Sequence, residues 1–309
     1  MKKSILILVM SCNDNFFIQE EEHIKNTWAK PIIEKKYDNI DFLIYRSGPE
    51  EKIDYENHIM YIDCEDDLDN TFKKTCYAFN MICNKYDFVF RTNTSTFVNV
   101  ELLNAFVQNI TINDVPALWT SEIYSLIESP APFPLYLYGR GNGLLIPNLF
   151  INIILSECTG YLCLKQHDDY MIGNILNTYW LKRNEGYIDH LKSYAHGWYK
   201  CINVQADNNH QLCKWGNINN DFDFLKKFIT IQVKNYVNRN DEIKNLYELN
   251  DIFSKNKDNN IQQTIDGIIE YSKNPSVFIG SKLGYIDLNT WKETPLNKMY
   301  AIQKSVESL

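Results

Sequence analysis

The chain has 309 residues, of which 45% are hydrophobic and 23% are charged, as is ordinary for a folded globular protein. Its length allows either one large α/β domain or one domain with a helical appendage. The formal net charge of −8 excludes nucleic acid as the main expected partner, because phosphate binding requires a basic surface. A local basic pocket for a diphosphate is still compatible with this acidic whole.

The first segment reads as a buried strand. Residues 1–12 combine a basic start with a short apolar run, as a signal peptide does, but the polar residues 13–15 follow with no small-residue cleavage site. No apolar run is long enough to span a bilayer. The eight cysteines form no CxxC array, so zinc is not expected. We therefore expect a cytoplasmic protein with reduced thiols.

Strand and helix patterns alternate along the chain. Strands are predicted at residues 5–10, 41–45, 58–62 and 88–91, and helices at 20–28, 67–84, 100–108, 147–156 and 168–180. Such alternation predicts an α/β fold with a mostly parallel central sheet and helices on both faces. The charged, periodic residues 240–272 predict further helix. We expect one domain over residues 1–238 and a mainly helical C-terminal extension over residues 239–309.

One strand ends in a short polar turn. The apolar residues 88–90 lead through Arg91 into Asn93, Thr94 and Ser95. Strand ends of this kind are where open α/β sheets place ligand sites. The stretch resembles the strand of β-1,3-galactosyltransferase and Fringe-like enzymes that ends in three acidic residues and then Phe/Tyr-Val-Asn. In that family the acidic triplet holds a divalent metal against the diphosphate of a sugar nucleotide, and here residues 93–95 stand in its place.

Three more segments resemble the same family in the same order. Residues 23–28 are similar to its Ile-Arg-x-Thr-Trp, residues 67–73 to its Asp-x-Tyr-x-Asn-Leu-Thr-x-Lys, and residues 134–147 to its Tyr-Pro-Pro-Tyr and glycine-rich segment. Glycines there would let the backbone approach the donor sugar. Each segment alone also fits an ordinary helix end, capped helix or turn. The resemblance implies the nucleotide-sugar transferase fold called GT-A and a UDP-sugar donor.

The resemblance, together with the need for cations that hold a diphosphate, indicates which residues face the donor. The expected donor-binding residues are Ser11, Asn13, Lys25, Lys73, Arg91, Asn93, Ser95, Arg140, Gly141, Gly143 and Lys234.

An acidic pair is the candidate for catalysis. Residues 167–173 resemble the family's Glu-Asp-Val-x-x-Gly, in which the second acid opens a helix and is the general base. The match carries this role onto Asp169, with Asp168 next in line. A carboxylate at a helix start is kept ionised by the helix dipole and can accept a proton at neutral pH. The alternative is that either residue merely caps the helix.

The absent acidic triplet predicts a metal-free site. Cationic side chains would then stabilise the leaving diphosphate, and the candidates are Arg91, Arg140, Lys234 and Arg239. Lys234 follows the strand-like residues 231–233. A second possibility is that Asn93, Ser95 and a distant Asp hold Mn or Mg weakly through oxygen ligands.

The favoured function is an inverting glycosyltransferase that transfers a sugar from a UDP-sugar to a glycan hydroxyl, in the synthesis of lipopolysaccharide, capsule or a viral glycan. The alternatives are a catalytically inactive GT-A-like protein that binds a glycan or a partner, and a nucleotidyltransferase, for which no glycine-rich signature is present near the N-terminus. Residues 240–309 could serve the acceptor, a dimer contact or peripheral association with a membrane.

Overall fold

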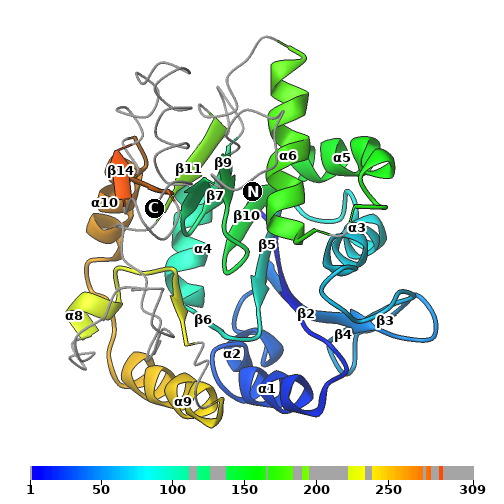
Figure 1. Ribbon diagram of the computed structural model, residues 1–309. Coiled ribbons are helices and arrows are strands. Elements are labelled where there is room, and N and C mark those ends of the chain that lie inside the picture. The colour runs from blue at the N-terminus through cyan, green and yellow to red at the C-terminus, as the bar shows by residue number, and fades with distance from the viewer. Residues whose placement is uncertain are drawn as a thin grey trace, which may run out of the picture.

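The computed structural model describes residues 2–110, 117–125, 137–164, 166–183, 190–194, 222–233, 239–273, 276–279 and 285–287. Its centre is an eight-stranded sheet with the order β11-β7-β10-β5-β1-β2-β4-β3 (Figure 1). The strands are β1 (Ile5–Met10), β2 (Ile40–Ser47), β3 (Lys52–Asp54), β4 (Ile59–Ile62), β5 (Phe88–Asn93), β7 (Leu118–Thr120), β10 (Leu144–Pro147) and β11 (Leu191–Ser193).

The sheet is mostly parallel on the side of the chain's N-terminal half. Strand β1 pairs in parallel with β2 and β5, and β2 pairs in parallel with β4. Strand β10 runs antiparallel between β5 and β7, and β3 is an antiparallel edge strand. This arrangement confirms the predicted α/β class. Strand β10 itself was not predicted, because its four apolar residues follow directly on the glycine cluster.

Helices cover both faces of the sheet. They are α1 (Asn15–Asn26), α2 (Lys30–Ile33), α3 (Thr71–Ile82), α4 (Val100–Asn109), α5 (Asn148–Glu157), α6 (Asp168–Leu181), α8 (Phe222–Leu225), α9 (Asn240–Lys255) and α10 (Ile261–Lys273), with a 3-10 turn at Cys158–Gly160. Helices α3, α5 and α6 pack on one face, and α1, α2, α4, α9 and α10 on the other (Figure 1). Strand β1 is therefore buried on both faces, which explains its uninterrupted apolar run.

Two helices begin at positions other than the predicted ones. Helix α1 begins at Asn15 rather than at residue 20, because Asp14 caps it and accepts a hydrogen bond from the Phe16 N–H at 2.9 Å. Helix α3 begins at Thr71 rather than at residue 67. The Asp67 carboxylate instead accepts a hydrogen bond from the Asn70 N–H at 2.8 Å and holds a turn before the helix.

Two small sheets join late parts of the chain to the centre. Strand β12 (Thr230–Gln232) pairs with β6 (Thr96–Val98), directly after the polar turn that follows β5. The second small sheet contains β8 (Ile123–Ser125), β9 (Leu137–Gly139), β13 (Ser276–Ile279) and β14 (Tyr285–Asp287). The strand-like residues 231–233 thus return beside the turn at residues 93–95.

The C-terminal helices share a core with the sheet. Leu246 and Leu249 of α9 and Ile265 and Ile268 of α10 are buried in the same cluster as Ile7 of β1. The expected boundary between residues 238 and 239 stays a prediction. Across the described ranges, no helix combines the length and the hydrophobicity needed to cross a membrane.

Candidate functional site

The topology of the sheet marks one edge as the candidate site. The β1–α1–β2 connection places its helix on one face, whereas the β4–α3–β5 connection places its helix on the other face. The order of the strands therefore reverses between β1 and β5. In open α/β sheets, ligands bind in the crevice outside the carboxyl ends of the strands at such a reversal. Ser11 follows β1 at this edge, and Asn93 ends β5 there.

A buried ion pair connects β5 to the start of α6. The Nη2 atom of Arg91 lies 2.7 Å from Oδ2 of Asp168, and the Arg91 side chain is only 1% exposed. The Thr75 hydroxyl of α3 donates to the same Asp168 oxygen at 3.1 Å. Burial lowers the pKa of Arg91, but Asp168, Tyr45 and Asp169 together raise it by more, so the net shift is upward and the guanidinium stays charged. In this structure Arg91 holds Asp168, and its charge is not presented to a diphosphate.

Asp169 has a different environment from its neighbour. It is half-buried, its Oδ2 accepts a hydrogen bond from the Gly141 N–H at 3.0 Å, and its Oδ1 accepts one from the Tyr170 N–H at 2.8 Å. Burial raises its pKa, the Asp168 charge raises it further, and Arg91 and the backbone donors oppose both. The dipole of α6 was expected to keep Asp169 ionised. Desolvation by burial is instead the largest influence on its pKa, and a carboxylate with a raised pKa is a stronger base when it is ionised.

The glycine loop of residues 140–143 is held from several sides. Arg91 donates a hydrogen bond to the Gly141 carbonyl, and the Thr92 hydroxyl donates to the Asn142 carbonyl at 2.9 Å. A Cβ atom on Gly141 would collide with the Arg91 guanidinium. Glycine at this position thus allows the loop to approach Arg91. The sequence alone did not show this reason for a glycine at position 141.

Tyr194 holds the other end of this loop. The Gly143 carbonyl accepts hydrogen bonds from the Tyr194 hydroxyl and from the Ser121 N–H, both at 3.0 Å. A Cβ on Gly143 would collide with the Tyr194 hydroxyl. Tyr194 was not predicted as a site residue, because an isolated tyrosine about 50 residues after the loop belongs to no motif.

The end of β1 is organised by Lys74 rather than by Lys73. The Lys74 ammonium, which is almost fully buried, donates to the Ser11 carbonyl at 2.7 Å and to Asp66 Oδ1 at 2.5 Å. Asp66 Oδ2 also accepts from the Asn13 N–H at 2.5 Å. Lys73 instead lies 5.6 Å from the ring centre of Tyr77. The predicted lysine is thus one position away from the buried one, and a turn of 100° per residue separates their directions.

The other predicted donor residues lie at several places. Lys25 pairs with Glu22 at 2.8 Å, and Arg140 pairs with Glu122 at 3.1 Å beside the glycine loop. The Ser95 carbonyl accepts from the Val233 N–H at 2.9 Å. Lys234 lies outside the described residues.

Arg239 stacks on a ring of α1. Its guanidinium carbon lies 4.9 Å from the ring centre of Phe16. This cation–π contact leaves the residue largely exposed.

The turn after β5 does not suit a tightly held divalent cation. Residues 93–95 offer one carboxamide and two hydroxyls, whereas such ions take charged carboxylate oxygens. Asn93 Oδ1 is buried and has no hydrogen-bond partner among the described residues. No group of three or more His, Cys, Asp or Glu side chains within the described ranges is arranged to bind a metal. We therefore derive no catalytic step through a metal.

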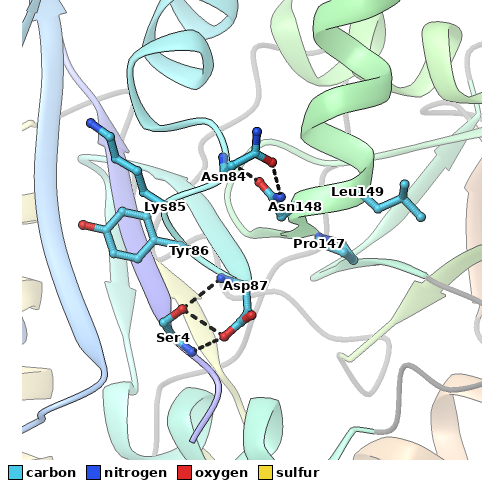
Figure 2. A pocket seen from close by; sticks show the side chains of 8 residues that line it. All are labelled: Ser4, Asn84, Lys85, Tyr86, Asp87, Pro147, Asn148 and Leu149. Atoms are coloured by element: carbon cyan, nitrogen blue, oxygen red, sulfur yellow. Dashed lines mark hydrogen bonds between the residues drawn. The ribbon is translucent and has the colours of Figure 1, made fainter. Parts of the chain in front are cut away.

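A separate cavity of about 450 Å³ lies at the amino end of β1 and β5 (Figure 2). It is lined by Ser4, Asn84, Lys85, Tyr86, Asp87, Pro147, Asn148 and Leu149. Its polar groups bind one another: Asp87 Oδ2 accepts from the Ser4 N–H at 2.7 Å, and Asn148 donates to Asn84 at 2.8 Å. None of the predicted site residues lines this cavity, so it is not part of the candidate site.

Comparison with known proteins leaves the family open. No family model and no curated protein matches the chain. Among solved structures, it is similar to a glycosyltransferase involved in the glycosylation of the major capsid of PBCV-1, with 12% identity and a TM-score of 0.41. The match covers 79% of this chain and 98% of that one. A likeness of this size carries no argument about the activity or substrates of this chain.

Proposed function

We propose that the protein is an inverting glycosyltransferase that uses a UDP-sugar and a glycan acceptor. The observation that carries the proposal is the position of Asp169. It is the second residue of α6, contacts the glycine loop, and belongs to the site at the reversal of strand order between β1 and β5. The resemblance of residues 5–180 to β-1,3-galactosyltransferases and Fringe-like enzymes agrees with this position.

The reaction is a single displacement at the anomeric carbon. An acceptor hydroxyl oxygen attacks that carbon, the new C–O bond forms on the face opposite to UDP, and the bond from the carbon to the diphosphate oxygen breaks. UDP leaves with the electron pair of that bond. Asp169 takes the proton of the acceptor hydroxyl, because its raised pKa favours proton transfer once the oxygen begins to bond.

The two adjacent acids, Asp168 and Asp169, have different roles in the proposed reaction. Asp168 is held by Arg91 at 2.7 Å and by Thr75, so its charge is already compensated. Among the described residues, Asp169 accepts hydrogen bonds only from two backbone N–H groups, which leaves lone pairs for a proton. Adjacent carboxylates whose environments differ in this way are the usual basis for separate roles in catalysis.

The leaving diphosphate requires cations of the protein. Arg91 is held by Asp168. Among the described residues, the favoured cation for the diphosphate is therefore Arg140, at one end of the glycine loop, whose side chain is 27% exposed. Lys234 is the second candidate, because its neighbour Val233 binds the Ser95 carbonyl. Metal-free stabilisation by these cations is part of the proposal.

A second candidate function is a catalytically inactive GT-A-like protein that binds a glycan or a partner. It is favoured by the replacement of the acidic triplet by residues 93–95. The two candidates differ in whether a bound donor is consumed.

A thermal-shift experiment with UDP, GDP and CMP tests the donor class. We expect UDP to raise the melting temperature most, with and without EDTA, because the resemblance to a UDP-sugar family implies that Ser11, Asn13 and Lys73 face the donor. Equal shifts with all three nucleotides, or none with UDP, would contradict the donor assignment.

A further inference from the structure

The face of the β8–β9 hairpin beside Asp169 carries a row of tyrosines. Tyr124 of β8 and Tyr138 of β9 are directly opposite each other in the antiparallel pair, with ring centres 6.0 Å apart. Tyr170 of α6 meets Tyr138 edge-to-face at 5.7 Å. All three residues are partly exposed to solvent. We call Tyr124, Tyr138 and Tyr170 the tyrosine row.

The residues that alternate with the row belong to the core. Ile123 is fully buried and Leu137 is 2% exposed, so the second face of the hairpin packs inward. Alternation along a strand then directs Tyr124 and Tyr138 away from the core. On this face Tyr170 and Gly173 of α6 pack against Tyr138, and the three tyrosines keep a partial exposure that a ligand can use.

The row begins at the proposed base. Tyr170 directly follows Asp169 in α6 and donates its N–H to the Asp169 carboxylate. Gly173, one turn later, packs so closely that a Cβ atom there would collide with Cβ of Tyr138. Burial raises the pKa of Tyr138, and the nearby Asp169 charge raises it further. The row and the base are therefore held together by the packing of α6 on β9.

Charged groups mark the other end of the row. The Arg140 N–H donates to the Glu122 carbonyl at 3.0 Å, which continues the pairing of β8 and β9 by one register position. The Arg140 guanidinium lies 5.2 Å from the ring centre of Tyr124, and its Nη1 lies 3.3 Å from the Tyr124 hydroxyl. Since Arg140 also ends the glycine loop, the row runs from the proposed donor side to the proposed base.

We propose that the tyrosine row is the acceptor subsite and that it binds a hexopyranose ring, with one ring hydroxyl presented to Asp169. A hexopyranose has an apolar face of C–H groups and a rim of hydroxyls. Tyrosine rings offer an apolar surface with a polar hydroxyl at its edge, at a low entropic cost of ordering. This inference rests on the proposed function and adds to it the chemical class and the position of the acceptor.

Saturation-transfer NMR tests the subsite without requiring turnover. The probes are the methyl pyranosides of galactose, glucose and N-acetylglucosamine, each added to the full-length protein with UDP. We expect at least one probe to receive saturation on the C–H protons of one ring face. Tyr138→Leu and Tyr124→Leu should each lose at least about five-fold of this signal. The control is Tyr179→Leu, at the far end of α6, which should keep it.

The outcome separates this inference from the donor assignment. Retention of the signal in both variants, or no signal from any probe with the wild-type protein, would overturn the acceptor subsite. The UDP-induced thermal shift, measured on the same samples, should be unchanged in the variants. Absence of that shift in the wild-type protein would contradict UDP as the donor nucleotide. It would not change the conclusion from the hexopyranose signal. If either variant fails to fold, Tyr170→Leu, from the other end of the row, replaces it.

Discussion

At the scale of single residues, two neighbouring aspartates have opposite surroundings. Asp168 is buried against Arg91, whereas Asp169 accepts two backbone N–H groups and is half-buried. The motif in the sequence pointed to both acids and to the order of their roles. It did not reveal that Arg91 is the partner of Asp168, because the two residues lie 77 positions apart and only the fold brings them together.

Replacement of the proposed base should remove turnover and leave nucleotide binding. In Asp169→Asn the side chain cannot take a proton, and only its one oxygen can accept a backbone hydrogen bond. We expect kcat to fall by about 10²–10⁴-fold, the usual contribution of general base catalysis. The measurement is UDP release from a UDP-sugar, with UDP binding as the control. Turnover close to that of the wild type would move the role to another group, with Asp168 the next to be replaced.

Removing one partner of the Arg91–Asp168 ion pair should destabilise the fold more than replacing both partners with apolar residues. Arg91→Met leaves a buried carboxylate without a partner and should lower the free energy of unfolding by about 3–5 kcal/mol. The double variant Arg91→Met/Asp168→Leu removes both charges and should recover most of that loss. Urea denaturation measures both. A double variant as unstable as the single one would show that packing, rather than the unpaired charge, causes the loss.

At the scale of elements, α1 and α9 meet the polar turn after β5 through a carboxyl pair. Glu20 of α1 is fully buried, and Glu242 of α9 is 3% exposed. Burial raises the pKa of Glu20 to about 8, with Glu242 adding to the shift, and Thr94 and Arg239 opposing it. Glu20 is therefore mostly protonated at neutral pH. Figure 1 shows α9 beside α1 at the foot of the molecule.

The sign of the pH effect follows from this raised pKa. The folded protein holds the Glu20 proton up to about pH 8, whereas the unfolded chain releases it near the ordinary value of 4.5. Stability from this group is complete below pH 4.5 and is lost as the pH rises from 4.5 to 8. Glu20→Gln carries no such proton, and it should not show this loss.

Denaturation at a series of pH values measures the difference. Between pH 5 and pH 8.5, the wild type should lose on the order of 2–5 kcal/mol relative to Glu20→Gln, since each unit of pKa shift corresponds to about 1.36 kcal/mol. The matched control is Glu22→Gln, an exposed glutamate on the same helix. Parallel pH curves for the wild type and Glu20→Gln would contradict the buried, protonated state.

Element boundaries separate what was predictable from what was not. Strand β1 was predicted to the residue, because an apolar run that is buried on both faces is distinctive. Strands β6, β8 and β9 were not predicted, because each has only three residues. Periodicity needs more residues than these strands contain, so only the assembled sheet shows them.

At the scale of the whole molecule, one arrangement connects fold and proposed function. The strand order reverses between β1 and β5, and the ends of both strands, the glycine loop and the start of α6 are connected there by hydrogen bonds through Lys74, Arg91 and Asp169. The α/β class could be predicted from alternation alone. The packing of α9 and α10 on the central core could not be predicted. Their apolar stripes show that one face of each helix is buried, but the stripes do not show which surface that face packs against.

The most direct test of the account is UDP release by the wild-type protein from a panel of UDP-sugars in the presence of EDTA, with the methyl hexopyranosides as acceptors. We predict that at least one UDP-sugar is consumed, that an acceptor accelerates its consumption, and that EDTA leaves the rate unchanged. Full loss of activity in EDTA with recovery in manganese would contradict the metal-free site. Failure to consume any UDP-sugar, with or without manganese, would contradict the assignment as a glycosyltransferase.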